Sequence, residues 1–389
     1  MASISSLHSL TLELPPSCIE FVPGHRDLFV VGTYYLDRSA DEDSGEVAED
    51  TEKKSQQRSG SLLLFQLDGD EPKLIRTLPT PFAVFDLHFT PPAHGDPALL
   101  GAASSTGSLA LYRVSRTQHP EIQHLRTLQL FPQNSLITFF AWHPRTPLLA
   151  GLALADGSAH LCALPSPDDP ATDADPDPEA FTPCLAPLLA HDLEAWFLTF
   201  APAGTALYTG GDDSALKFRS LPDPSTPPAA QWQDRRIHAA GVTAILPLAG
   251  PNLLLTGSYD DRVRLLRVPD PSGSRGGGVR RPVVLAEADL GGGVWRLKDI
   301  TPEAAAGGEQ REFVVLASCM HAGARVLRLR ASSPDEGEEW QFEVLASFEE
   351  HQSMNYGSDV QPLASGEEGG QRTVVSTSFY DRLLCVWKW

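Results

Sequence analysis

The segment LLLTGSYDDRVRLLRV, residues 253–268, carries the pattern that decides the fold. An apolar run, Leu253–Gly257, is followed by a short polar turn and then by Arg262–Val268, in which apolar and polar side chains alternate. Alternation with a period of two is typical of a half-buried strand, and glycine and aspartate between two such runs favour a tight turn. The segment therefore predicts a β-hairpin.

The same hairpin recurs along the chain. Gly210-Gly211-Asp212-Asp213 matches Gly257-Ser258-Tyr259-Asp260 roughly 47 positions later, and Ser378-Phe379-Tyr380-Asp381 has the equivalent place near the end. This spacing is typical of the blades of a β-propeller. The strand after the turn is expected at residues 61–67, 108–114, 158–164, 215–221, 262–268, 324–330 and 383–389. We therefore predict an all-β, seven-bladed propeller of WD40 type, with residues 1–389 forming one domain.

The last repeat lacks a strand. Two strands precede each of the strands above, and a fourth strand follows in six repeats, for example at Leu74–Leu78, but the chain ends at Trp389 before the seventh. His8–Leu14 alternates and precedes the first complete repeat. We expect this N-terminal strand to complete the last blade, since closure leaves only short, protected edges.

Long polar inserts interrupt the repeats. Residues 37–59, 165–183 and 269–282 are rich in acidic residues, in Asp and Pro, and in Gly and Arg, respectively, and we expect disordered loops. In a four-stranded blade, the loops after the first and third strands open on one face of the ring and the other loops open on the opposite face. Nearly all long inserts except 37–59, including a further one at residues 301–311, fall on the first face. We therefore expect the functional site on the face with the short loops.

Composition narrows the partners. The formal net charge is −20 with only 30 Lys and Arg residues, which argues against direct nucleic-acid binding because phosphate contacts need clustered cations. No apolar stretch approaches the length of a membrane span. Five widely spaced cysteines form no CxxC pair, and the N-terminus has no signal-peptide pattern. We expect a soluble, cytoplasmic monomer with reduced thiols, no membrane contact and a cationic partner.

Polar residues cluster on the short-loop face. His191, His238 and His351 precede three blades whose tight turns carry Asp213, Asp260 and Asp381. Such a His and Asp commonly form a structural hydrogen-bond network in WD40 proteins, and this interpretation stands beside a catalytic one. Tyr259 and Tyr380 directly precede two of the aspartates. Tyr259 and Tyr380 either pack at strand ends or line a pocket that binds a cationic group.

Two further segments enter or leave the sixth blade. Cys319-Met320-His321 occupies a turn position, where Cys319 fits a buried thiol and His321 is the better candidate for acid–base chemistry. Gly291-Gly292-Gly293-Val294-Trp295-Arg296 lacks a phosphate-loop pattern and brings Trp295 near the channel. Glu194 and Trp196 fit a ligand site or ordinary packing. No metal motif and no GxSxG elbow is present, so no cofactor is expected.

Together these motifs resemble the WD-repeat diphthine methyl ester hydrolases (diphthine methylesterases) of diphthamide biosynthesis. The resemblance spans all seven blades. The residues that carry it are Val31-Gly32-Thr33-Tyr34, Phe85-Asp86, His191 with Glu194-Ala195-Trp196, Gly210-Gly211-Asp212-Asp213, Thr256-Gly257-Ser258-Tyr259-Asp260, the Gly291–Arg296 and Cys319–His321 segments, Tyr356-Gly357 with Asp359, and Ser378-Phe379-Tyr380-Asp381. One departure is that the repeat-ending Trp, present as Trp387, is Arg219 and Leu266 in the fourth and fifth blades.

The resemblance implies hydrolysis of the methyl ester of methylated diphthine, a modified histidine of translation elongation factor 2, before amidation. The substrate of the family carries a trimethylammonium group, which fits aromatic faces near negative charge. The expected substrate-binding residues are Tyr259, Tyr380, Trp295, Arg296, Glu194 and Asp359, and the expected catalytic residues are His321, Asp260 and Asp381. Two alternatives remain: a non-catalytic interaction scaffold or adaptor, and a reader that binds the modified histidine without turnover.

Overall fold

The computed structural model describes residues 3–36, 58–95, 98–115, 117, 119–168, 184, 186–221, 230–250, 252–270, 280–302, 311–332, 339–363 and 370–389. Most of each expected insert (residues 37–57, 169–183 and 271–279) lies outside the described residues, so its expected disorder stays a prediction. Residues 58 and 59, assigned to the first insert from the sequence, instead begin a strand.

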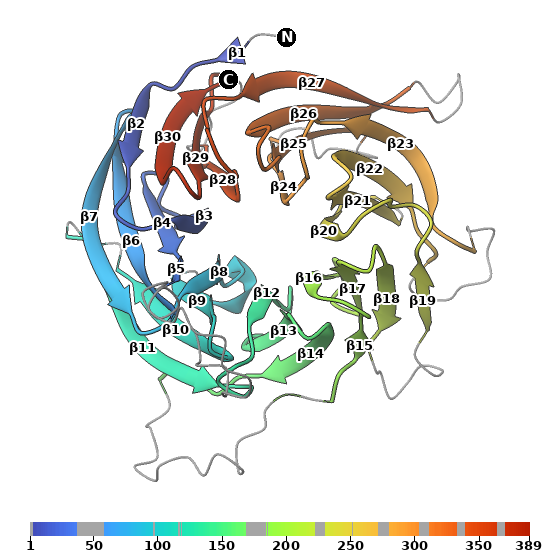
Figure 1. The fold of residues 1–389 in the computed structure, drawn as a ribbon, viewed down its shortest axis with the longest axis horizontal. Coiled ribbons are helices and arrows are strands. Elements are labelled where there is room, and N and C mark those ends of the chain that lie inside the picture. Colours follow the sequence, from blue (N-terminus) through green and yellow to red (C-terminus); the bar gives the residue numbers. More distant parts are fainter. Residues whose placement is uncertain are drawn as a thin grey trace, which may run out of the picture.

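Seven sheets, in which consecutive blade strands pair antiparallel, stand around a central axis, which confirms the predicted propeller (Figure 1). We number the blades by their innermost strands in chain order. The innermost strands are β3 (Pro16–Phe21), β8 (Val84–Phe89), β12 (Ile137–Trp142), β16 (Ala195–Phe200), β20 (Val242–Pro247), β24 (Arg296–Asp299) and β28 (Gly357–Val360). The second strands are β4 (Leu28–Thr33), β9 (Leu99–Ser104), β13 (Leu149–Leu154), β17 (Ala206–Gly211), β21 (Leu253–Ser258), β25 (Glu312–Ser318) and β29 (Thr373–Ser378).

The third strands are β6 (Arg58–Asp68), β10 (Ser108–Val114), β14 (Ser158–Ala163), β18 (Leu216–Ser220), β22 (Arg262–Arg267), β26 (Ala324–Ala331) and β30 (Leu383–Lys388). The outer strands are β7 (Glu71–Thr80), β11 (Ile122–Gln129), β15 (Leu189–Ala190), β19 (Gln231–Asp234), β23 (Val283–Asp289) and β27 (Trp340–Phe348). A short strand β5 (Tyr35–Leu36) pairs with β6, and within the described residues the helical structure is one 3-10 turn, Pro92–His94.

The N-terminal strand β2 (His8–Thr11) is the outer strand of blade 7. It pairs antiparallel with β30, with His8 opposite Val386 and Thr11 opposite Leu383. This pairing confirms the predicted closure of the ring. An additional strand that the sequence did not indicate, β1 (Ser3–Ile4), pairs parallel with β27 of blade 6.

The hydrophobic core lies between neighbouring blades. Every residue of the second strands β4, β9 and β21 is buried, because a blade on each side covers both faces of the strand. Close approach of two blades leaves little room at Gly151, where an added Cβ would stand 2.4 Å from Leu198. The blades therefore pack closely against one another, which positions the residues at their ends.

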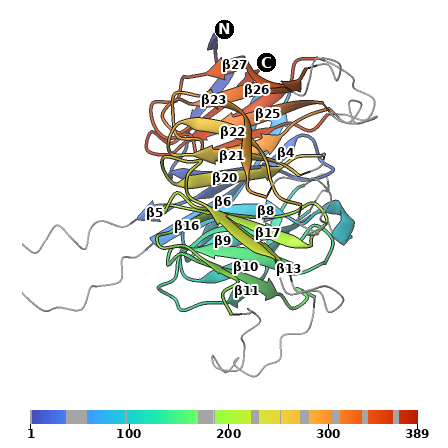
Figure 2. The same cartoon turned by 90° about the vertical axis from the view of Figure 1, so that its right-hand side faces the viewer.

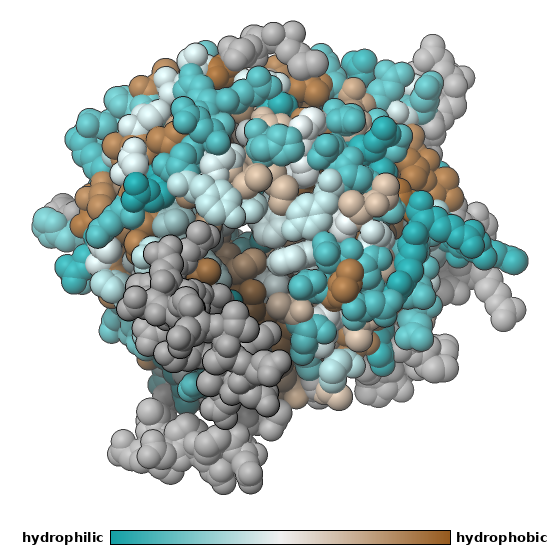
Figure 3. Space-filling model, in the orientation of Figure 1, coloured by the Kyte–Doolittle hydropathy of each residue, from teal (hydrophilic) through white to brown (hydrophobic). Residues whose placement is uncertain are grey.

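The two faces of the ring differ. The blade-to-blade connections and the turns between second and third strands open on one face, which we call the site face; β5 lies on it, and the Pro92–His94 turn lies on the opposite face (Figure 2). Figure 3 looks onto the site face and shows that it is hollowed near its centre. Among the helical segments that the structure describes, none has the length and apolarity to cross a membrane.

One expectation about the cysteines is wrong. Cys162 and Cys184 form a disulfide, while Cys18, Cys319 and Cys385 are free and buried. Cys162 lies near the end of β14, and Cys184 forms an isolated antiparallel β-bridge with it. This pairing places their Cα atoms 4.1 Å apart. Their separation of 22 residues gave no sign of this pairing.

Candidate functional site

The predicted histidines are buried and bonded to hydroxyl groups of the second strands. Nε2 of His191, His238 and His351 lies 2.9, 2.9 and 2.8 Å from Thr209, Thr256 and Ser376, respectively. In blade 7, the Trp387 indole N–H also donates to the Ser376 hydroxyl, at 3.0 Å. Burial lowers the pKa of His238 and of His351 to about 4. These contacts favour the structural interpretation of the three histidines.

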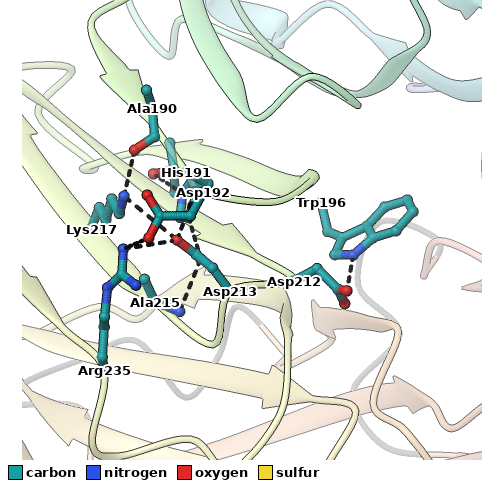
Figure 4. A network of polar contacts seen from close by, with 10 residues as sticks. Ala190, His191, Asp192, Trp196, Asp212, Asp213, Ala215, Lys217 and Arg235 are labelled. Atoms are coloured by element: carbon teal, nitrogen blue, oxygen red, sulfur yellow. Dashed lines mark hydrogen bonds and ion pairs between the residues drawn. The ribbon is translucent and has the colours of Figure 1, made fainter.

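Asp213 and Asp212 point in different directions (Figure 4). The Asp213 carboxylate lies 2.7 Å from His191 Nδ1 and also contacts Lys217 and Arg235. Asp212 instead accepts a hydrogen bond of 3.2 Å from the Trp196 indole N–H. Asp213 is therefore held within blade 4, and Asp212 faces the aromatic residues described below.

Two of the predicted catalytic residues hold turns. Asp260 forms an ion pair of 2.9 Å with Arg264 and accepts backbone N–H groups of Ala239 and Arg262. Burial raises the pKa of Asp260, but these partners outweigh it and the pKa is lowered. Asp381 accepts the backbone N–H of Gln352 at 2.9 Å. Since a carboxylate saturated by such partners is a poor base, these contacts favour a structural role for Asp260.

The third predicted catalytic residue, His321, is exposed in the turn after β25. No hydrogen bond or ion pair joins it to the described residues. Burial raises the pKa of the neighbouring Cys319 thiol to about 12, so this cysteine is not an activated nucleophile. Met320 has a left-handed φ of 44°, and the Asn355 backbone N–H donates to its carbonyl at 3.0 Å. His321, Asp260 and Asp381 lie in turns of neighbouring blades, but no contact among the described residues joins them.

Eight aromatic side chains form a contiguous group on the site face, which we call the aromatic belt. Its members come from six blades and are Tyr34, Phe85, Trp196, Tyr259, Trp295, Tyr356, Phe379 and Tyr380. The Trp295 ring lies 5.0 Å from Tyr356, 5.7 Å from Trp196 and 6.1 Å from Tyr259, measured between ring centroids. Phe379 continues the belt to Tyr356, Tyr380 and Tyr34.

Backbone direction explains the belt. The first strand of each blade leaves the site face and the second strand returns to it. Trp196 lies at the start of β16, Trp295 and Tyr356 directly precede β24 and β28, and Tyr259 and Phe379 directly follow β21 and β29. The belt therefore collects one residue from each of five blades and three from blade 7, all at or next to the strand ends on the site face. The signal for Tyr34, Phe85, Tyr356 and Phe379, which were not among the predicted site residues, is their shared position in the aligned repeats.

Arg296 reaches across the channel beneath the belt. It belongs to blade 6, yet its guanidinium carbon lies 4.9 Å from the ring centre of Phe139 in blade 3 and 5.6 Å from that of Phe197 in blade 4. It also stacks on Trp295 at 4.7 Å. Asp86 of blade 2 is 3.8 Å from Nη2. The side chain thus forms a cationic floor under the aromatic belt.

Negative charge lies beside the belt. Burial raises the pKa of the Tyr259 phenol, and the carboxylates of Asp212 and Glu194 raise it further. The structure therefore brings together Tyr259, Trp295, Arg296 and Glu194 of the predicted binding residues, with Tyr380 at the rim, 66% exposed. Asp212 is a member that the predicted set lacked.

Asp359 is not part of this group. It is 1% exposed and accepts the backbone N–H groups of Phe21 and Val360, at 2.8 and 2.7 Å, and an ion pair from Lys298. Because it comes three residues after Tyr356, it lies about 10 Å deeper along β28. Asp359, predicted to bind substrate, therefore lies deeper in the channel than the aromatic belt.

The arrangement suits a ligand with a cationic and a carbonyl or anionic group. Aromatic faces with nearby carboxylates attract a quaternary ammonium, and a guanidinium with free donors binds an oxygen that carries negative charge. Within the described residues, no group of three or more His, Cys, Asp or Glu side chains could hold a metal ion.

Comparisons with known proteins agree with the fold and with the motifs. No protein-family model matches the chain. A chain from the crystal structure of the mitotic checkpoint complex has the same fold, with a TM-score of 0.62 and 13% identity over 99% of this chain and 96% of that one. This likeness concerns the fold alone.

Curated proteins named diphthine methyltransferase match in sequence. The protein of Saccharomyces cerevisiae is 28% identical, over 98% of this chain and 97% of its own. Those of Schizosaccharomyces pombe and Mus musculus are each 27% identical, over 96% and 91% of this chain and 94% and 69% of their own. The chain is therefore similar, over nearly its whole length, to proteins that carry this name, which supports the diphthamide family that the motifs indicate.

Proposed function

We propose that this protein hydrolyses the methyl ester of methylated diphthine on translation elongation factor 2, the step before amidation. The observation that carries the proposal is the aromatic belt with Arg296 as its floor. A trimethylammonium group fits the rings, and a guanidinium stabilises the oxyanion that forms when water attacks an ester. The names of the relatives link them to diphthine. The reaction takes place in the cytoplasm, with the protein acting as a monomer.

The residues take distinct roles in this proposal. Trp295, Tyr259 and Tyr380, with Glu194, hold the trimethylammonium group, and Arg296 holds the ester carbonyl. His321 activates the attacking water, since its exposed imidazole has no partner among the described residues. Asp260 and Asp381 hold the turns that carry Tyr259 and Tyr380.

The test is methanol release from elongation factor 2 that carries methylated diphthine, with the mass of the modified histidine followed in parallel. We expect stoichiometric methanol and conversion of the ester to the acid. Arg296→Gln should lower kcat by about 100-fold, because the loss of one oxyanion donor has an effect of this size. Arg330→Gln, on the outer part of blade 6, serves as the control. If the methyl ester persists on elongation factor 2 that is verified by mass to carry methylated diphthine, the proposal is contradicted.

The name of the relatives indicates transfer of a methyl group, which would add a methyl group where hydrolysis removes one. A second reaction mixture therefore contains elongation factor 2 with diphthine that lacks the methyl ester, together with an isotope-labelled sulfonium methyl donor. We expect no label on the elongation factor. Transfer of the label would replace hydrolysis with methylation as the function of the site.

A reader that binds without turnover is the second candidate. The observation that favours it is that no nucleophile and base are in contact among the described residues of the site. In that case the modified elongation factor would bind in an Arg296-dependent manner and its ester would stay intact. A scaffold or adaptor would show neither hydrolysis nor dependence on Arg296.

A further inference from the structure

Four ionisable side chains beneath the aromatic belt alternate in the sign of their charge. Arg296 Nη2 lies 3.8 Å from Asp86 Oδ1, Asp86 Oδ2 lies 3.0 Å from His88 Nε2, and His88 Nδ1 lies 3.1 Å from Glu20 Oε2. We call these residues the ionic network. They come from three blades, and apart from Arg296 none belongs to the site described above.

Asp86 is shared unequally between its two cationic neighbours. Its carboxylate, which is 3% exposed, lies with Oδ2 3.0 Å from His88 Nε2, an ion pair in which neither atom makes a hydrogen bond to the described residues, and with Oδ1 3.8 Å from the guanidinium. Among the described residues, Arg296 Nη1 donates a hydrogen bond to the carbonyl oxygen of Trp295, at 3.0 Å. The guanidinium carries five N–H donors, so most of them remain available to a ligand.

His88 lies between two carboxylates. Burial lowers its pKa, but Asp86 and Glu20 outweigh burial and raise the pKa to about 10. Its other neighbours are the rings of Phe139 and Phe140 in β12, each 5.2 Å away and without charge. Lys298 of β24, which pairs with Asp359, lies close enough to Glu20 to interact with it. The two carboxylates of the network are thus balanced by His88 and Arg296, with Lys298 acting on Glu20 as well.

We infer that His88 is a positioning residue whose imidazolium holds Asp86 away from Arg296 and so keeps the guanidinium free to bind an oxyanion or carboxylate. The inference deepens the proposed function and, where it concerns the ester oxyanion, rests on it. With a neutral side chain at position 88, Arg296 would be the cation nearest to Asp86. A small rotation of the carboxylate would then close the 3.8 Å gap and occupy the donors.

The kinetic test uses His88→Gln, which removes the charge, and the double variant Asp86→Asn/His88→Gln, which also removes the carboxylate. We expect His88→Gln to lower kcat by about 10- to 100-fold, with KM changed less than about threefold, because the transition-state oxyanion loses its donor. The double variant should recover most of that loss. A residue that only supports the fold would give no recovery.

Two further variants make the test specific. His88→Lys keeps a positive charge and should stay within about fivefold of the wild-type kcat, which also covers the case that glutamine prevents folding. His124→Gln, in the exposed outer strand of the same blade, is the matched control and should leave kcat unchanged. Unchanged kcat in His88→Gln, or equal loss in the single and double variants, overturns the inference.

A second readout does not depend on hydrolysis. The Arg296 Nε–H resonance of protein labelled with ¹⁵N-arginine, assigned by its loss in Arg296→Lys, is titrated with sodium acetate. We expect acetate to shift this resonance in the wild type, weaker binding in His88→Gln, and recovery in the double variant. Equal acetate binding in wild type and His88→Gln overturns the inference. If the wild type releases no methanol but this pattern holds, the proposed function fails and the role of His88 stands.

Discussion

At the scale of single residues, Trp295 has the most central place in the aromatic belt, in contact with Trp196, Tyr259 and Tyr356 and stacked on Arg296. We predict that Trp295→Leu raises the Kd for the modified elongation factor by about 5- to 30-fold, because a desolvated cation–π contact contributes about 1–2 kcal/mol. Trp295→Phe, which keeps an aromatic ring, should raise the Kd less than Trp295→Leu.

The measurement is equilibrium binding of the modified factor by calorimetry. Trp232→Leu is the matched control, since this residue stacks on Phe218 in the outer part of blade 4, away from the belt. Equal affinity of wild type and Trp295→Leu would remove the belt from the binding site.

Two buried histidines predict a loss of stability in acid. The pKa of His238 and of His351 is lowered by burial to about 4 in the folded protein, against an ordinary value near 6.5 in the unfolded chain. Their contribution to the free energy of unfolding is therefore complete above about pH 6.5 and is lost as the pH falls towards 4. We expect about 1 kcal/mol less unfolding free energy per histidine at pH 5.5 than at pH 7.5.

Urea unfolding at both pH values measures this change. His238→Gln/His351→Gln should be less stable than wild type at pH 7.5 but should show a flatter dependence between the two pH values. A pH dependence as steep as that of the wild type would show that other groups cause it.

Residue patterns indicated where to look but not what each group does. Asp260 and Asp381 stood out because tight turns repeat aspartate, yet Asp260 is bound by Arg264, four positions along the same strand hairpin. Asp260 lies in the turn and Arg264 in β22, so the contact depends on the turn geometry and not on strand alternation alone. The charge partners of Arg296 were not visible in the sequence, because Asp86 and His88 come from blade 2 and meet it only across the channel.

At the scale of structural elements, the disulfide fastens the segment before β15 to β14. Cys162 and Cys184 are 22 residues apart, and a closed loop of this length restricts the unfolded chain by about 3 kcal/mol. We predict that Cys184→Ser lowers the unfolding free energy by up to this amount. Reducing agent should lower the stability of the wild type equally and leave the variant unchanged, as followed by thermal unfolding.

Cys385→Ser is the comparison, because Cys385 is free and buried. Its stability should remain sensitive to reducing agent. A wild type that is indifferent to reduction would contradict a stabilising role of the bond.

The strands themselves were largely predictable, because each hairpin repeats the alternation seen at residues 253–268. Their ends were less so. The sequence pattern predicts the first strand of blade 6 at Val294–Lys298, but the strand begins at Arg296. The backbone N–H groups of Val294 and Trp295 instead donate to the carbonyls of Ser258 and Ser318 at the entry to the blade. β1 escaped prediction because two residues carry no periodicity.

At the scale of the whole molecule, ring closure depends on one short strand. We predict that removal of residues 1–14 exposes the edge of β30, lowers the urea midpoint and promotes self-association, because an unpaired strand edge is a template for pairing. Removal of residues 1–5, which deletes only β1, should have a much smaller effect. Urea unfolding and light scattering measure the two outcomes. Equal stability of both truncated proteins would mean that β2 does not close the ring.

The functional site belongs to this scale as well. Seven blades and their closure follow from repeats that the sequence displays, whereas the aromatic belt joins residues from Tyr34 to Tyr380. Each of those residues looks ordinary within its own repeat. Their proximity results from the curvature that brings equivalent strand ends around one axis, a property of the assembled ring.

The pairing of β2 with β30 also has a consequence for synthesis of the protein. The ribosome makes β2 long before β30, because synthesis proceeds at about 5–20 residues per second. His8–Thr11 therefore waits roughly 20 to 80 seconds for its partner, and the ring closes only after Lys388 has left the exit tunnel. Until β30 has been made, the arc of blades keeps an unpaired strand edge, so the complete ring, and with it the aromatic belt, forms only after this strand has been synthesised.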